Sequence, residues 1–76
     1  MDIKIVKSII SQMTMLNEGE IQDSDVLRDI GIDSLGYVDL IIKLEDQFSI
    51  AFDDSDLNID NLSTVESIVK LVERYI

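Results

Sequence analysis

Cysteine, histidine and proline are all absent from this chain of 76 residues. Without cysteine the chain can form no disulfide and carries no thiol nucleophile of its own. Without histidine it lacks both a common metal ligand and the side chain whose ordinary pKa suits proton transfer near neutral pH. Most classes of enzyme therefore fit this composition poorly.

Basic residues are scarce, since six Lys and Arg stand against sixteen Asp and Glu, for a net charge of −10. Such a chain repels phosphate backbones and anionic lipid, so we expect no nucleic-acid partner. Apolar runs reach only two or three residues, as in Leu40-Ile41-Ile42, whereas a membrane span needs roughly 20. We therefore predict no membrane insertion. Because Lys4 and Lys7 are interspersed with aliphatic residues, unlike the charge of a signal peptide, the expected compartment is the cytoplasm.

Hydrophobic residues make up 46% of the chain, which favours a folded protein over a disordered one. The length suits one small domain, predicted to span residues 1–76. Three apolar stripes recur at helical spacing. The first predicts a helix from about residue 2 to 15, the second follows Asp33 or Ser34, and the third follows Ser63 or Thr64. Their members are Ile3, Val6, Ile9, Ile10 and Met13; Tyr37, Leu40, Ile41, Leu44 and Phe48; and Val65, Ile68, Val69, Val72 and either Tyr75 or Ile76.

The segments between the stripes lack this period. Residues 16–33 predict a long ordered loop, and residues 53–56 form a second, acidic loop before a single helical turn at 57–61. Asp2 suits the start of the first helix, and Ser63 with Glu66 fits a capping box for the last. The first loop is expected to turn four side chains inward: Ile21, Val26, Leu27 and Ile30. Together these patterns predict an all-α protein, a small four-helix bundle of three main helices and one short helix.

The negative charge is concentrated in residues 17–66, where fourteen acidic residues face only Arg28 and Lys43, for a net charge of −12. The second predicted helix also has a second apolar line, Leu35, Val38 and Ile42, flanked by carboxylates. An apolar ridge with a charged rim is typical of a docking surface for a basic partner. The alternatives are that the charge serves solubility and that the line is the edge of a wide buried stripe.

The segment Gly31-Ile32-Asp33-Ser34-Leu35 joins the long loop to the second helix. A serine at a helix start is most often a cap. Gly31, however, permits a positive φ, and the first turn of a helix has free N–H groups that suit a phosphate. No residue of the chain is placed to activate Ser34 as a nucleophile. If Ser34 is reactive, another protein must activate it.

These residues resemble a known family. The segment from Asp29 to Leu35, followed by Leu44-Glu45-Asp46-Gln47-Phe48 and Ile50, is similar to the acyl carrier and peptidyl carrier proteins, and the resemblance covers essentially the whole chain. It implies a stand-alone carrier, not an enzyme. A phosphopantetheinyl transferase would move 4′-phosphopantetheine from coenzyme A onto the Ser34 hydroxyl. The thiol of that arm would then carry an acyl or aminoacyl group as a thioester.

The resemblance also implies the partners. Asp33 and Leu35 would help the transferase to grip the site. The second helix would dock on basic patches of acyl- or aminoacyl-loading, condensing or transferring enzymes, with the carrier acting as a monomer. That docking role falls to Leu35, Val38, Asp39, Ile42, Glu45 and Asp46. Gly36 and Ala51-Phe52 depart from the usual fatty-acid carriers, which favours a polyketide, nonribosomal peptide or aminoacyl pathway.

Other functions are weighed against this one. An acidic helical interaction module without a covalent arm would use the same ridge and charges, and Ser34 alone separates the two. A calcium loop opening at Asp54 requires Gly at position six and Glu at position twelve, where this chain has Ile59 and Val65. No metal site is therefore expected. An independent enzyme would need a cleft that so small a bundle is not expected to form.

Overall fold

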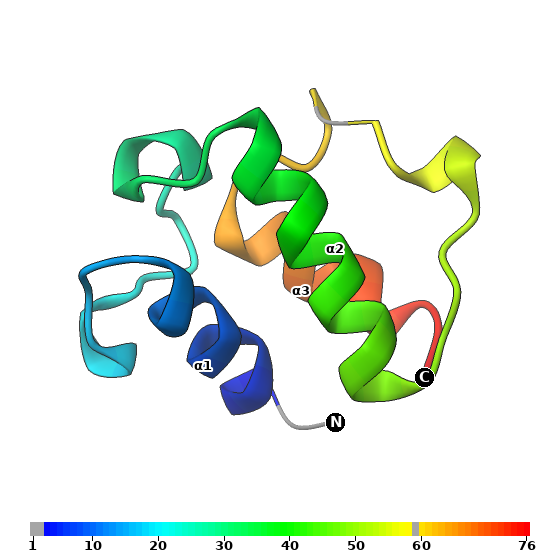
Figure 1. The fold of residues 1–76 in the computed structure, drawn as a ribbon, viewed down its shortest axis with the longest axis horizontal. Coiled ribbons are helices and arrows are strands. Elements are labelled where there is room, and N and C mark those ends of the chain that lie inside the picture. Colours follow the sequence, from blue (N-terminus) through cyan, green and yellow to red (C-terminus); the bar gives the residue numbers. More distant parts are fainter. Residues whose placement is uncertain (1–2, 59) are drawn as a thin grey trace.

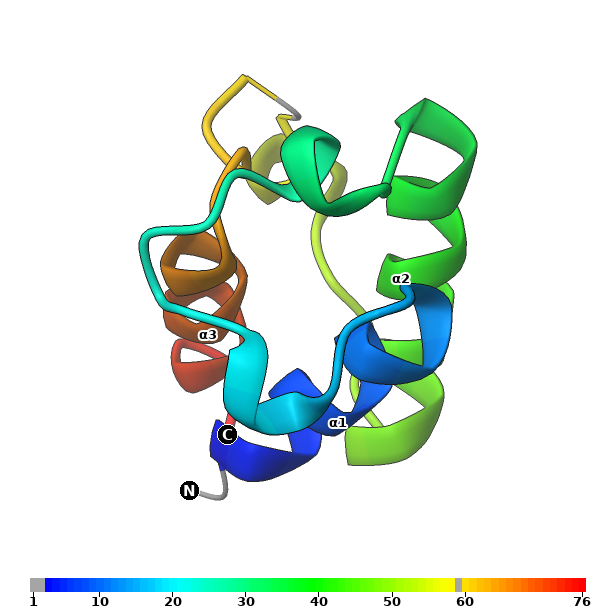
Figure 2. The ribbon, with the colours of Figure 1, turned by 90° about the vertical axis from the view of Figure 1, so that its left-hand side faces the viewer.

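The computed structural model describes residues 3–58 and 60–76, and within these it is built from helices and turns (Figure 1). The α-helices are α1 (Ile3–Met13), α2 (Ser34–Phe48) and α3 (Val65–Glu73), and the 3₁₀ turns are η1 (Glu18–Glu20), η2 (Leu27–Ile30) and η3 (Asp54–Asp56). Figure 2 shows the three α-helices around a common interior, with the α1–α2 connection crossing one side. The predicted all-α bundle is confirmed, with its fourth, short helix present only as 3₁₀ turns.

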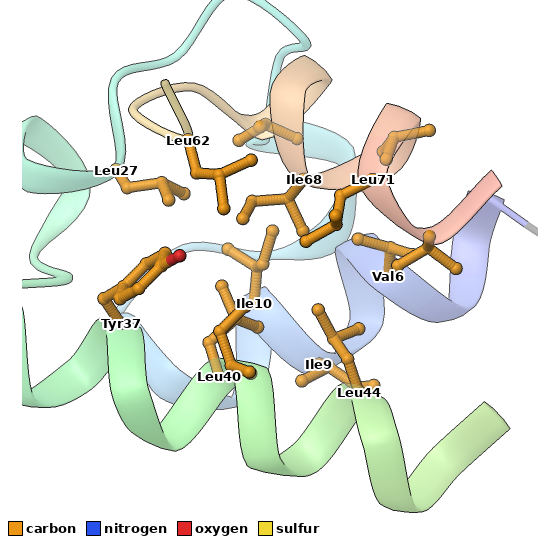
Figure 3. Packing of buried hydrophobic residues seen from close by; sticks show 14 of the residues in the cluster. Val6, Ile9, Ile10, Leu27, Tyr37, Leu40, Leu44, Leu62, Ile68 and Leu71 are labelled. Carbon is orange, nitrogen blue, oxygen red and sulfur yellow. The ribbon is translucent and has the colours of Figure 1, made fainter. Parts of the chain in front are cut away.

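The interior is filled by one face of each α-helix (Figure 3). All of the second stripe is buried except Phe48, which is partly buried, and the third stripe is buried from Val65 to Val72. Tyr75 rather than Ile76 packs against the core, since Ile76 is 55% exposed. Four further core residues lie outside both the predicted stripes and the side chains expected to turn inward from the first loop: Ile32, Phe52, Leu62 and Leu71.

The long connection between α1 and α2 is fixed to the start of α3 by backbone hydrogen bonds. The amide of Leu27 donates to the carbonyl of Ser63 (2.8 Å), and the amide of Val65 donates to the carbonyl of Asp25 (3.0 Å). Ile21 and Leu27 are buried as expected, and Ile30 is partly buried. The expectation for Val26 is wrong, because its backbone pairs with Thr64 at the edge of the fold while its side chain stays 38% exposed.

Helix α1 ends at Met13, two residues before the predicted end. The hydroxyl of Ser11 donates to the carbonyl of Leu16 (2.9 Å), and the amide of Leu16 donates to the hydroxyl of Thr14 (3.2 Å). These local side-chain hydrogen bonds compete with the helical pattern and replace it with a turn. The predicted cap at Asp2 lies outside the described residues.

The short turn lies at Asp54–Asp56 rather than at 57–61. Within 57–61 the chain forms a hydrogen-bonded turn at Asn58, whose side-chain oxygen accepts from the amide of Asp60 (3.0 Å) and whose carbonyl accepts from the amide of Asn61 (2.9 Å). This is the local turn that Asn favours.

The capping box of α3 is also displaced by one residue. Thr64 is the cap, and Ser67 bonds back to its amide (3.1 Å). The predicted pair of Ser63 and Glu66 does not form. The carbonyl of Ser63 instead accepts from Leu27, and the carboxylate of Glu66 pairs with Lys70 (2.9 Å).

Candidate functional site

The approach to α2 is set by Gly31 and Asp33. Gly31 ends η2 in the left-handed region at φ 101°, as its predicted freedom at positive φ allows. Asp33 is the N-cap, and its carboxylate accepts from the amide of Gly36 (2.8 Å). The cap at the start of α2 is therefore Asp33, the first of the two predicted candidates, which leaves Ser34 without a structural task of this kind.

Ser34 is the first residue of α2 and is exposed. Its hydroxyl makes no hydrogen bond to the described residues, and the backbone amides of Ser34 and Leu35 precede the first helical donors. The first turn thus presents a nucleophile-bearing side chain beside unpaired N–H groups at the positive end of the helix dipole. This arrangement suits a phosphate attached to the Ser34 oxygen.

A groove of about 360 Å³ lies beside Ser34, between η2, the start of α2 and the chain before α3. Tyr37 lines it and is 7% exposed. Its hydroxyl is buried without a hydrogen-bond partner among the described residues, and burial raises the pKa of this tyrosine. The full lining is Val26, Leu27, Arg28, Asp29, Ile32, Asp33, Ser34, Tyr37, Asp60, Leu62 and Ser63.

Sequence analysis missed this groove. Its walls come from three segments that are distant along the chain, and no local pattern indicates that they meet. Tyr37 was assigned only to the buried stripe of α2. The one indication of the groove in the sequence is a tyrosine among aliphatic residues, because a buried tyrosine hydroxyl requires a hydrogen-bond partner.

The outer face of α2 carries the second apolar line. Leu35 is 82% exposed, Val38 54% and Ile42 57%. At 100° per residue these three lie on the side of the helix opposite Tyr37, Leu40 and Leu44. The interpretation of the line as an edge of the buried stripe is therefore wrong.

The carboxylates predicted to flank this line differ in their surroundings. Asp39 pairs with Lys43 across 3.7 Å, and Asp46 is exposed. One carboxylate oxygen of Glu45 accepts from the amide of Phe52 (2.8 Å), which ties the chain after α2 back to the helix. The six predicted docking residues thus share one face of α2, but Glu45 also has an internal structural task.

Within residues 3–58 and 60–76, the acidic side chains form no group of three or more that could hold a metal ion. None of the helices in this described part of the chain combines the length and the apolar character needed to cross a membrane.

The chain is similar to known proteins in both sequence and structure. The family model described as the phosphopantetheine attachment site matches residues 4–72. An acyl carrier protein of Thermotoga maritima is 40% identical over 53 residues, which are 68% of this chain and 65% of that protein. A non-reducing polyketide synthase of Emericella nidulans is 38% identical over 52 residues, which are 68% of this chain and only 2% of the synthase.

Solved structures show the same fold. The holo acyl carrier protein of Nitrosomonas europaea has a TM-score of 0.81 at 26% identity, covering 97% of this chain and 95% of that one. A chain from the Bradyrhizobium japonicum complex of glycine:[carrier protein] ligase with glycylated carrier protein has a TM-score of 0.69 at 26% identity, covering 91% and 90%.

The family match covers most of the chain, and the structural matches include carriers in the holo and the glycylated form. The all-α fold agrees with the structural matches. Residues 4–72 therefore form a carrier domain, and the cofactor of this family is 4′-phosphopantetheine. The chain belongs to the family of phosphopantetheine-binding acyl carrier proteins.

Proposed function

We propose that Ser34 is the residue that bears 4′-phosphopantetheine. One observation carries this assignment: the hydroxyl of Ser34 is exposed at the first position of α2 and has no partner among the described residues. The local residues fit the group. Asp33 caps the helix, so the Ser34 hydroxyl is not needed as a cap and is available for attachment. The amides of the first turn favour a phosphate at this position.

In the attachment step the Ser34 oxygen attacks the phosphorus of coenzyme A that bears the pantetheine. A new P–O bond forms, the phosphoanhydride bond breaks, and adenosine 3′,5′-bisphosphate leaves. The proton of the hydroxyl passes to a base of the transferase, because this chain contains neither histidine nor cysteine to accept it. Once bound, the group supplies the thiol that holds an acyl or aminoacyl group as a thioester.

The outer face of α2 is the proposed docking surface for partner enzymes. Its apolar centre, Leu35, Val38 and Ile42, is exposed, and its carboxylates complement basic patches. A phosphopantetheinyl transferase is the first proposed partner, with Asp33 and Leu35 beside the attachment point. Loading, condensing or transferring enzymes are the others. The complex of a related carrier with a glycine ligase supports this kind of partner.

For the pathway, we propose specialised metabolism of the polyketide, nonribosomal peptide or aminoacyl kind rather than primary fatty acid synthesis. The support is the departure at Gly36, together with relatives that include a polyketide synthase and a glycylated carrier. We further propose that residues 1–76 act as one monomeric domain in the cytoplasm.

Intact mass tests the attachment site. Folded wild-type protein is incubated with coenzyme A and a broad-specificity transferase, beside Ser34→Ala and Ser63→Ala, the latter because Ser63 lines the same groove. We expect one phosphopantetheine on wild type and on Ser63→Ala, and none on Ser34→Ala. No gain on folded wild type would favour an acidic interaction module without an arm. A gain on Ser34→Ala would place the attachment elsewhere.

The rate of the same reaction tests the docking surface. Val38→Ala removes apolar contact from the outer face of α2, and Met15→Ala is the matched control because Met15 is 100% exposed and lies outside that face. A contact worth about 1 kcal/mol lowers kcat/KM roughly fivefold. Equal rates for the two variants would contradict docking through Val38.

A further inference from the structure

Four carboxylates lie at the start of α2 and along it, and they differ in how far the chain itself uses them. Three have an internal partner, which is an amide for Asp33 and Glu45 and the Lys43 ammonium for Asp39. The Asp46 side chain is exposed and makes no hydrogen bond or ion pair with the described residues. Asp46 is therefore the one carboxylate of this group whose oxygens are both uncommitted.

Lys43 is the only basic residue of α2 and the only one between Arg28 and Lys70. It pairs with Asp39 across 3.7 Å, and both side chains are about half exposed. At 100° per residue, Asp39 lies between Lys43 and the apolar line of the outer face. A basic side chain that approaches Asp39 from that face therefore meets the positive charge of Lys43 and must compete with it for the carboxylate.

Asp46 lies close to the apolar line as well, because it follows Ile42 by four residues on the same helix. It comes seven residues after Asp39, so the two carboxylates are about 10 Å apart along the helix axis. No ion pair among the described residues neutralises Asp46. The negative charge available to a partner is thus displaced toward the end of α2 that is remote from Ser34.

We propose that Lys43 is a specificity-determining residue of the docking surface, which masks Asp39 and so directs a basic residue of the partner to Asp46. This role rests on the proposed docking surface and refines it. The partner that fits is an enzyme with a basic side chain opposite the end of α2 and none opposite Asp39, because a base placed there is repelled by Lys43. Lys43 thus selects against docking patches that are uniformly basic.

Rates of phosphopantetheine transfer test this ranking of the two carboxylates. The probe partner is the broad-specificity transferase with coenzyme A at low ionic strength, where surface charges act most strongly on association. Asp46→Asn should lower kcat/KM roughly fivefold, which corresponds to about 1 kcal/mol. Asp39→Asn should lower it by less than about twofold, because the Asp39 carboxylate is already paired. Once Lys43→Gln has removed the mask, Asp39→Asn should become as costly as Asp46→Asn.

Lys70→Gln is the matched control for Lys43→Gln, because it changes the net charge by the same amount. Lys70 forms an exposed ion pair of the same spacing with Glu66 (2.9 Å), but on α3, which lies across the interior from α2 (Figure 2). Lys43→Gln should raise kcat/KM about threefold, as for unit charges roughly 7 Å apart in water, whereas Lys70→Gln should change it by less than about 1.5-fold. Exposed pairs contribute little to stability, so both variants should keep the fold, which circular dichroism verifies.

Three results would overturn this role of Lys43. Equal costs of Asp39→Asn and Asp46→Asn in wild type would mean that Asp39 is not masked. An unchanged cost of Asp39→Asn in Lys43→Gln would mean that Lys43 does not compete for that carboxylate. Equal rate gains for Lys43→Gln and Lys70→Gln would leave only an effect of net charge. Val38→Ala separates the levels of failure: a normal rate for this variant removes the docking surface itself, and a reduced rate together with any of the three results removes only the masking role.

Discussion

At the scale of single residues, Asp33 and Ser34 divide the tasks that a helix start usually combines. Asp33 accepts from Gly36 and caps α2, while the Ser34 hydroxyl has no partner among the described residues. We predict that Asp33→Ala lowers the free energy of unfolding by about 1 kcal/mol and that Asp33→Asn costs less, because Asn also caps. Urea denaturation of the apo protein measures both.

Ser34→Ala is the matched control for this cap. It removes a hydroxyl one residue further along the same turn, and we expect a change within roughly 0.5 kcal/mol because no internal hydrogen bond is lost. If Ser34→Ala proved as destabilising as Asp33→Ala, the capping role assigned to Asp33 alone would be wrong.

For Tyr37 we predict that a substitution raises the free energy of unfolding. Its buried hydroxyl lacks a partner, and its ring packs in the core. Tyr37→Phe keeps the ring and removes the orphaned group, so we expect the apo protein to gain about 1 kcal/mol in free energy of unfolding. Thermal and urea unfolding of the apo form measure the gain. A loss of stability would mean that the hydroxyl already has a favourable partner in the apo protein.

The residue scale also shows what sequence can and cannot reveal. Gly31 and Asp33 were predictable because a positive φ and a helix cap each restrict the residue types at one position. The orphaned hydroxyl of Tyr37 was not. It depends on Leu27 and Leu62, which approach it only in the folded chain and have no fixed spacing to it in sequence.

At the scale of elements, the turn η3 is joined to the end of α3 through Asp56. The hydroxyl of Tyr75 donates to one oxygen of Asp56, and Arg74 donates to the other (3.1 Å). The hydrogen bond from Tyr75 and the charge of Arg74 lower the pKa of Asp56, and the bond to Asp56 raises the pKa of Tyr75. These contacts make η3 and α3 a pH-dependent unit.

The directions of the two pKa shifts make the contribution of this contact to stability constant at intermediate pH and smaller at both low and high pH. A lowered pKa at Asp56 contributes stability above its ordinary value of 3.8, which is lost as pH falls below that value. A raised pKa at Tyr75 contributes stability below its ordinary value of 10.0, which is lost as pH rises above it. We predict that the stability difference between wild type and Tyr75→Phe is constant between these values and shrinks on both sides.

Urea unfolding from about pH 3 to about pH 11 measures this difference. Phenylalanine retains the edge-to-face contact with Phe52, whose ring centroid lies 4.9 Å from that of Tyr75, so the variant isolates the hydroxyl. Asp56→Asn is the second control and should lack the acidic flank. Parallel curves for wild type and Tyr75→Phe would rule out the coupling.

Elements with a repeating pattern were the ones that sequence predicted well. The stripe of α2 repeats over about three turns, so burial of Tyr37, Leu40 and Leu44 followed from spacing alone. The short turns were misplaced because single local bonds decide them. Asn58 makes such a local bond to Asp60. At the start of α3, Ser63 and Thr64 have similar capping ability, and Thr64 is the cap while the carbonyl of Ser63 accepts from Leu27.

At the scale of the whole molecule, the outstanding property is the net charge of −10, with −12 in residues 17–66. Among the described residues, the ion pairs of Lys70 with Glu66 and of Lys43 with Asp39 are exposed, whereas two further pairs each have one part-buried member, Lys7 and Asp56. Exposed pairs contribute little. The electrostatic contribution to stability is therefore dominated by repulsion among the excess carboxylates, which opposes the compact state. The same excess is what the proposed charge-steered docking surface requires, so the feature that lowers stability is the one on which the proposed binding depends.

This balance predicts the response to salt. Added sodium chloride screens repulsion more than it weakens the few exposed pairs, so the Tm of the apo protein should rise from low to physiological ionic strength. Relief of about 1 kcal/mol corresponds to roughly 4–8 °C for a domain of this size. The double variant Asp53→Asn with Asp54→Asn is the matched control, because both carboxylates are exposed and neither makes a hydrogen bond or an ion pair with the described residues. It should melt higher than wild type at low salt and respond less to added salt. A flat or falling Tm in wild type would mean that the ion pairs outweigh the repulsion, and the charge would then serve docking without any cost to the fold.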